Sequence, residues 1–310
     1  GVFWISREVH GRVSPAAFMA LPFIYGHPFM FGFVNFALAM GLTLNAFALW
    51  LRLGRLGKRR LRFWLFLPIG LIVWVTHSFA WGVLGILCFS AETVRNHDAK
   101  MNWIKAAFHA GLHCLSMIPP ALLMVYLRIS SGAGAGDAGQ WFRWDSKLAW
   151  FMMVVRDRWQ NFDLLTLAFV LCAFYVFARS KAFQFSRNLG VTALILAVLY
   201  VLLPHVVMGS AYTDMRLMPY IFLIALLAVR PTPGAGMKTL TVAAIVSLAF
   251  FLVRLGGNTY SFFLYHQRHT ATLEALDHIP QGANMVSFMG RRTGVPWYTN
   301  REEHIAAIAI

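Results

Sequence analysis

Long apolar runs separated by short basic loops are the feature that most limits what this chain can fold into. Apolar residues make up 59% of the 310 residues and charged residues only 13%, about half the charged share of a soluble domain. The sequence therefore predicts an all-α polytopic membrane protein with about seven to nine transmembrane or half-membrane helices. The runs cover residues 29–51, 63–77, 78–92, 104–127, 161–178, 190–208, 215–229 and 239–255.

The net charge of +15 does not indicate a nucleic-acid-binding protein, because the basic residues gather in short loops between the apolar runs. Such loops mark the cytoplasmic side of a membrane protein. Basic loops stand on both sides of residues 63–94, so this stretch is expected to turn back near His77-Ser78, with a single tilted helix as the alternative. The hairpin places the following outside: residues 1–28, 129–160, 209–214 and the tail after 256.

Two regions are expected. Residues 1–256 are predicted to form the helical bundle, and residues 257–310 the beginning of a small extramembrane α/β domain. In the tail, Tyr260–Ile279 predicts a helix and residues 283–288 a buried strand. Since the chain begins at Gly1 and stops inside an apolar stretch, we expect an internal fragment of a longer protein.

The outer loop 129–160 contains an amphipathic stretch from Trp141 to Val155. Its Trp and Arg residues are typical of an interfacial helix that lies on the membrane. An ordinary packed loop helix is an equally good interpretation.

The segment Gly-Ser-Ala-Tyr-Thr-Asp-Met-Arg at residues 209–216 carries the main candidate site. Charges at the edge of a hydrocarbon core are costly and usually face a cavity or a partner. Arg216 offers a planar fork suited to phosphate, so Asp214 and Arg216 are candidate donor-phosphate or lipid-binding residues. The alternative is a structural pair that orients two helices, with Asp214 capping the helix that follows.

Two histidines join this candidate site. His77 lies at the predicted outer turn and His205 just before the 209–216 segment, so both are expected on the side of Asp214. A neutral imidazole there could donate to a phosphate or relay a proton, although a structural role is favoured for each histidine alone. Glu8 is a candidate general base, for which a solvated loop charge is the favoured interpretation; the catalytic residue stays unassigned.

No metal site is predicted. His109 and His113 lie four residues apart on one helix face without a third ligand, so packed histidines are favoured. Cys88, Cys114 and Cys172 lie in or near apolar runs, with no metal or disulfide spacing. The cofactor is unknown, and the need for a divalent cation is left open.

Several of these stretches resemble bacterial multi-spanning glycosyltransferases of the GT-C type. The resemblance is carried by Gly32-Phe-Val-Asn-Phe-Ala-Leu-Ala-Met-Gly, by His77, by the Gly-Ser-x-x-x-Asp-x-Arg pattern at 209–216, and by Ile279-Pro-Gln-Gly-Ala. It implies transfer of a sugar from a polyprenyl-phosphate donor at the periplasmic face of the bacterial inner membrane. The implied partners are the polyprenyl-phosphate-linked sugar and membrane lipid, with the C-terminal tail in the periplasm. That family keeps its catalytic carboxylate in the first outer loop, and this chain is expected to begin after that loop.

Three functions from different classes remain open. The first is a membrane glycosyltransferase, of the hexosyltransferase kind, with Arg216 at the donor phosphate. The second is a transporter or flippase of a lipid-linked or anionic solute, which should show inverted repeats and charges near mid-membrane; no convincing repeat is visible and the charges lie at the edge. The third is a non-catalytic membrane scaffold. The sugar, the acceptor and the oligomeric state are not determined by the sequence.

Overall fold

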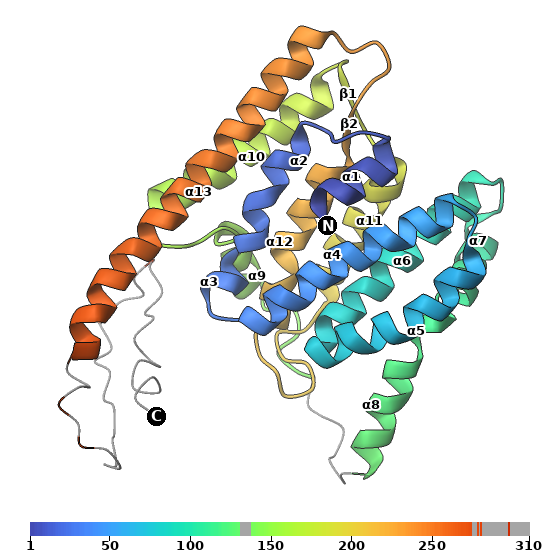
Figure 1. Ribbon diagram of the computed structural model, residues 1–310, viewed down its shortest axis with the longest axis horizontal. Coiled ribbons are helices and arrows are strands. Elements are labelled where there is room, and N and C mark those ends of the chain that lie inside the picture. Colours follow the sequence, from blue (N-terminus) through green and yellow to red (C-terminus); the bar gives the residue numbers. More distant parts are fainter. Residues whose placement is uncertain (131–137, 275–277, 279, 281–296, 298–310) are drawn as a thin grey trace.

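The computed structural model describes residues 1–130, 138–274, 278, 280 and 297, and in this part the chain is mostly helical (Figure 1). The helices are α1 (Val2–His10), α2 (Ala16–Ala20), α3 (His27–Met30), α4 (Val34–Arg55), α5 (Arg59–Thr76), α6 (Ser78–Asp98), α7 (Trp103–His113), α8 (Pro119–Ser130), α9 (Trp144–Met152), α10 (Gln160–Arg179), α11 (Arg187–Leu202), α12 (Thr213–Ala228) and α13 (Met237–Leu273). Two 3-10 helices, η1 (Leu21–Tyr25) and η2 (Leu115–Met117), and one two-stranded sheet complete the described fold.

Three described helices are long and apolar enough to cross a membrane: α4, α10 and the Met237–Thr270 part of α13. A fourth crossing is possible if α7 and the segment Leu115–Ser130, which are bent by 48° at their junction, count as one span. Helices α11 and α12 have 16 residues each, about 24 Å of rise against a hydrocarbon core of about 30 Å. The mostly helical character of the chain is confirmed, and the predicted seven to nine spans are not.

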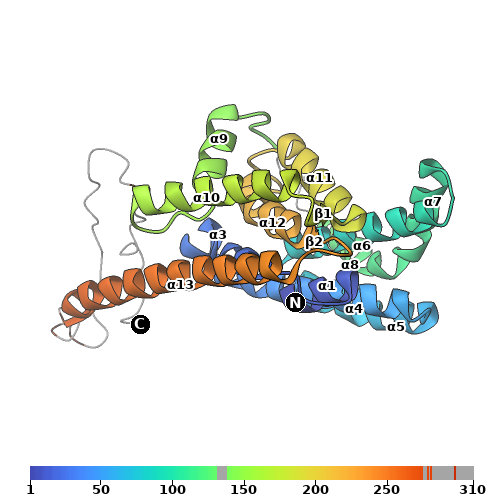
Figure 2. The same ribbon diagram turned by 90° about the horizontal axis from the view of Figure 1, so that it is seen from above.

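Helix α12 is the central helix of the bundle (Figures 1 and 2). It packs against α2, η1, α9 and α11, and 14 of its 16 residues are buried. A helix that is buried on all sides, as α12 is, belongs to the interior of a larger structure. Gly26, which directly follows η1, lies close to α12: a Cβ placed on Gly26 would lie 2.8 Å from the Cβ of Pro219. Only glycine permits this contact.

The predicted hairpin at residues 63–94 is present. Helix α5 ends at Thr76 and α6 begins at Ser78, with His77 in an extended conformation between them. The His77 Nδ1 accepts a hydrogen bond from the Phe79 N–H at 3.2 Å and so caps α6. Far from this turn, Arg62 of α5 and Glu92 of α6 form an ion pair at 2.7 Å, which shows that the two helices are antiparallel.

The basic loops meet at one end of the molecule. Arg62 and Arg95 share the carboxylate of Glu92, and Arg187 bonds to Asp98 at 2.8 Å. Strand β1 (Phe183–Phe185) pairs antiparallel with β2 (Val229–Pro231), which joins the loops before α11 and after α12. We call this the basic end; it comprises residues 52–62, 95–105, 179–187 and 229–238. The opposite end contains the α5–α6 turn and the first turn of α12, and we call it the Arg216 end.

The N-terminal residues 1–28 were expected together on the outer side, and they do not lie at one end. Glu8 of α1 accepts a hydrogen bond from Arg55 at the basic end, where the Ser14 hydroxyl also donates to the Val229 carbonyl at 2.7 Å. At the Arg216 end, the His27 N–H donates to the Val154 carbonyl at 3.0 Å. Helices α2 and η1 therefore lead from one end to the other along α12.

The expected division at residues 256/257 falls inside helix α13. This helix runs without a break through the separate helix predicted from Tyr260 and ends at Leu273 (Figure 1, orange). The Gly256-Gly257 pair does not end it, because Gly257 packs closely on Phe162: a Cβ there would lie 2.7 Å from the ring. One turn earlier, Arg254 is tied to Asp163 of α10 at 2.6 Å. The strand predicted at residues 283–288 lies outside the described residues.

Candidate functional site

A cavity of about 820 Å³ opens at the Arg216 end of the bundle. Its volume lies within the usual range for ligand pockets, about 300–1,000 Å³. Most of its walls are apolar, and they come from α5, α6, α8 and the turn before α12. The apolar lining residues are Trp74, Val75, Phe79, Trp81, Met124, Val207 and Met208; the polar ones are Asn35, Thr76, His77, Ser78, Ser210, Thr213 and Arg216.

Arg216 supplies the only cationic guanidinium or ammonium group among the described lining residues. Its side chain is nearly enclosed, with the residue 7% exposed. The guanidinium carbon lies 4.4 Å from the centroid of the Phe33 ring, and Nη1 donates to the Ser210 hydroxyl at 3.2 Å. The Nε–H is buried without a hydrogen-bond partner in the described part of the chain.

Two other buried arginines in this protein have carboxylate partners. Arg62 pairs with Glu92 at 2.7 Å, and Arg254 pairs with Asp163 at 2.6 Å. Among the described residues, no carboxylate lies within ion-pair distance of Arg216. A buried charge without a partner is costly, so a site of this kind is complementary to an anion that enters from the cavity.

Asp214 is fully buried, and its carboxylate contacts residues other than Arg216. Its Oδ1 lies 3.1 Å from Nδ1 of His205 and accepts the Met215 N–H at 2.9 Å. Its Oδ2 lies 3.7 Å from Nζ of Lys147. A carboxylate in the first turn of a helix is also favoured by the helix dipole. Asp214 therefore ties the start of α12 to α9 and to the segment after α11.

Lys147 completes this buried cluster. It is 4% exposed, and its ammonium donates to the carbonyls of Tyr200 and Leu203 at 2.7 and 2.8 Å. Burial lowers the pKa of Lys147, and the charge of Asp214 acts in the opposite direction. The Tyr200 hydroxyl donates back to the Lys147 carbonyl at 2.6 Å, which fixes α9 on α11.

The turn that carries Ser210 has a strained backbone. Met208 and Tyr212 have φ angles of 54° and 62°, and Gly209 has 77°. Left-handed backbone is unfavourable for residues with a Cβ and persists only where the surroundings fix it. Here the Tyr212 ring packs against His205 at 5.0 Å and against Trp150 at 6.0 Å between centroids. The consequence is that Ser210 is held beside Arg216.

The structure brings two of the predicted site residues into one cavity, Arg216 and His77. It places Asp214 and His205 in a pair outside the cavity lining. Glu8 is distant from all four, because it pairs with Arg55 at the last residue of α4, whereas Arg216 contacts Phe33 just before the first. The 22 residues of α4 span about 33 Å.

Three residues that contact the candidate site residues were not singled out from the sequence. Phe33 and Ser210 hold the Arg216 guanidinium, and Lys147 faces Asp214. The signal for Lys147 was a lysine in a helix rich in aromatic residues, Trp144-Asp-Ser-Lys-Leu-Ala-Trp. The sequence left an interfacial helix and an ordinary packed helix equally open; in the structure α9 is packed on its Lys147 face, while Trp144 remains 61% exposed.

Within the described ranges, no group of three or more His, Cys, Asp or Glu side chains could hold a metal ion. No protein-family model, curated protein sequence or solved structure matches this chain. What the protein does has therefore to be inferred from the cavity and its charge.

Proposed function

We propose that this chain is a membrane glycosyltransferase-like protein that binds a polyprenyl-phosphate-linked sugar at the periplasmic face, with Arg216 at the phosphate. The observation that carries this proposal is the buried Arg216 guanidinium, which faces a largely apolar cavity without a carboxylate partner among the described residues. A single anionic group joined to a long apolar chain matches both properties of the cavity.

Phosphate fits the donors at this site. Arginine binds phosphate through two parallel N–H bonds, and the stacking of Phe33 on the guanidinium face leaves the N–H edges for a ligand. The hydroxyls of Ser78 and Ser210 line the same cavity and can add neutral hydrogen bonds, whereas the Thr213 hydroxyl already donates to backbone carbonyls. The tryptophan and valine walls suit an isoprenoid chain.

His77 has a defined hydrogen-bonding role in this proposal. Because its Nδ1 accepts from the Phe79 N–H, the proton of a neutral His77 ring is on Nε2. His77 lines the cavity, so Nε2–H can donate to an anion held there. In sugar transfer the phosphate leaves with the negative charge, and fixed donors such as Arg216 and His77 would stabilise that charge as it develops.

No general base is assigned. The described lining of the cavity contains no carboxylate, and Glu8 is held by Arg55 at the basic end. The same observation favours a second candidate, a transporter or flippase of a lipid-linked solute, which needs an anion site and no base. The periplasmic location of the cavity is supported by the gathering of the basic loops at the opposite end.

The proposal is tested with the full chain in proteoliposomes and a radiolabelled polyprenyl-phosphate hexose. We expect Arg216→Gln to lower sugar transfer about a hundredfold or more, because one fixed donor to a developing charge contributes at least that factor. Arg60→Gln, at an exposed arginine of the basic end, is the matched control and should be neutral. Undiminished transfer by Arg216→Gln would remove the phosphate role. If wild type binds the donor and moves it across the bilayer without transfer, the second candidate replaces the first.

A further inference from the structure

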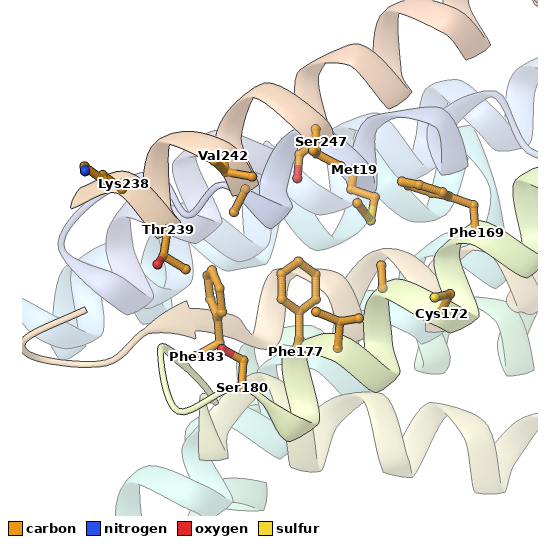
Figure 3. Close-up of a pocket in the computed structure, with 14 residues that line it drawn as sticks. Met19, Phe169, Cys172, Phe177, Ser180, Phe183, Lys238, Thr239, Val242 and Ser247 are labelled. Atoms are coloured by element: carbon orange, nitrogen blue, oxygen red, sulfur yellow. The ribbon is translucent and has the colours of Figure 1, made fainter. Parts of the chain in front are cut away.

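A second cavity, of about 490 Å³, lies between α10 and α13 with Met19 of α2 at its back (Figure 3). Figure 3 shows Lys238 and Thr239 at one end and Phe169 and Cys172 at the other. Between these ends the walls are mostly aliphatic and aromatic side chains, including those of Phe177 and Val242, together with Ser180 and Ser247. We call this cavity the α10–α13 groove.

The groove opens toward the surroundings of the protein. Val176 of α10 and Val242 of α13, which line it, are 53% and 60% exposed. Both helices are long and apolar enough to cross a membrane. At hydrocarbon depth, an open apolar groove is in contact with acyl chains, not with water.

The length of the groove matches one leaflet. Lys238 at its polar end and Ser247 near its deep end lie on the same helix, separated by a rise of about 14 Å. This is close to half of the hydrocarbon core of about 30 Å. Beyond Ser247 the Phe169 and Phe250 rings stack at 5.1 Å between the two helices, and a further apolar cavity of about 370 Å³ follows on the other side of this ring pair.

The polar end of the groove is cationic. Lys238 lies at the basic end, beside the chain segment that includes exposed Arg179 and Lys181. The Ser180 Oγ, which accepts the Ala182 N–H at 3.2 Å, keeps its own proton to donate. No acidic residue occurs from Leu164 to Thr213 or from Met215 to Leu273. The charge therefore favours an anionic headgroup at this end.

We propose that the α10–α13 groove holds one acyl chain of an anionic glycerophospholipid from the leaflet at the basic end, with the lipid phosphate at Lys238. This lipid is distinct from the polyprenyl-phosphate ligand, since the two sites lie at opposite ends of the bundle and share no lining residue. The proposal does not depend on sugar transfer.

The headgroup is tested by native mass spectrometry of the full chain released from nanodiscs of phosphatidylglycerol and phosphatidylcholine, in equal amounts and with identical chains. We expect the wild-type protein to retain one phosphatidylglycerol in preference to phosphatidylcholine. Lys238→Gln should lower that preference about fivefold, the factor expected for one lysine near an anionic lipid surface. Lys58→Gln, also exposed at the basic end but outside the groove, should leave it unchanged.

The acyl chain is tested with a bulky side chain. Val246→Trp, at a position that lines the groove, should remove the retained lipid. Leu252→Trp, 53% exposed on the same helix and outside the lining, should not. Three results would each overturn the proposal: equal retention of both lipids by wild type, equal effects of Lys238→Gln and Lys58→Gln, or lipid retained in Val246→Trp. A dimer that carries no lipid would also overturn it, because a second copy of the chain would then be the occupant of the groove.

Discussion

His205 Nδ1 lies 3.1 Å from Oδ1 of Asp214, so this carboxylate is engaged away from Arg216, its neighbour two positions along α12. Residues two apart on a helix point to different sides. Asp214 and Arg216, although only two positions apart in the sequence, therefore have different roles. Asp214 connects helices, and Arg216 faces the cavity.

The first prediction separates these two purposes. We expect Asp214→Asn to lower the free energy of unfolding by about 3 kcal/mol, because it leaves the buried Lys147 ammonium without its carboxylate. Arg216→Gln should leave the melting temperature in detergent close to that of wild type, since no ion pair is lost. In the double variant Lys147→Met/Asp214→Asn, part of the lost stability should return. Equal destabilisation by Asp214→Asn and Arg216→Gln would show that Arg216 serves the fold.

A second prediction compares two carboxylates of the basic end. Glu92 is fully buried between Arg62 and Arg95, so Glu92→Gln should cost about 3–5 kcal/mol. The Glu8 side chain is 5% exposed, but its ion-pair partner, Arg55, is 61% exposed and can be hydrated, so Glu8→Gln should cost less than Glu92→Gln. Chemical denaturation in mild detergent measures both. A larger loss from Glu8→Gln would contradict the burial argument.

The mostly helical class and the positions of most helices were predictable because their main signals are local, whereas the number of spans and the placement of residues 1–28 were not. The apolar runs and their basic flanks located most helices, and the requirement that both flanks of residues 63–94 be cytoplasmic placed the turn at His77, where the structure has it. The predicted division at residues 256/257 lies inside the continuous helix α13. What stabilises that helix is the packing of Gly257 on Phe162 and the Arg254–Asp163 pair, neither of which leaves a local signal.

The site was predictable in part for the same reason. Arg216 and His77 stood out as polar residues at the edges of apolar runs, and they line one cavity. The pairing of Glu8 with Arg55, and of Asp214 with Lys147, joins residues far apart in the sequence. Such pairs depend on how α1 and α9 pack on the bundle, which hydropathy and loop charge do not determine.

A third prediction concerns pH. His27 is buried, its two ring nitrogens have no hydrogen-bond partner in the described part of the chain, and burial together with nearby Arg156 lowers its pKa to about 3. The unfolded chain, with a histidine pKa of about 6.5, binds a proton more readily than the folded protein below that pH. Stability should therefore fall by about 1.4 kcal/mol per pH unit as the pH drops below about 6.5, in addition to the effects of other groups.

His27→Phe removes this titration and keeps an apolar ring in the same packing site. Thermal unfolding of wild type and variant between pH 7.5 and 5 gives the comparison, with both pH limits about one to one and a half units from the unfolded histidine pKa. The difference in stability between the two proteins should shift in favour of the variant at the lower pH. Parallel pH profiles of the two proteins would mean that His27 does not lower the stability of the folded protein on acidification.

A fourth prediction concerns orientation. In a cysteine-free background, Gln140→Cys should react with a membrane-impermeant maleimide added outside intact cells, and Lys58→Cys should react only after the cells are opened. Both positions are exposed. The reason is that the basic loops gather at one end and the Arg216 end lies opposite. The reverse labelling pattern would place the Arg216 cavity in the cytoplasm.

The most direct test of the Arg216 site is equilibrium binding of a fluorescent short-chain polyprenyl monophosphate to the full chain in neutral nanodiscs. We expect wild type to bind the phosphate and to bind the matching uncharged polyprenol more weakly. Arg216→Gln should raise the Kd for the phosphate by about tenfold to a hundredfold, the effect of losing a hydrogen bond to a charged group. The Kd for the polyprenol should stay unchanged. Equal affinities of wild type for phosphate and polyprenol, or an unchanged phosphate Kd in Arg216→Gln, would contradict the proposal that this buried guanidinium is a phosphate site.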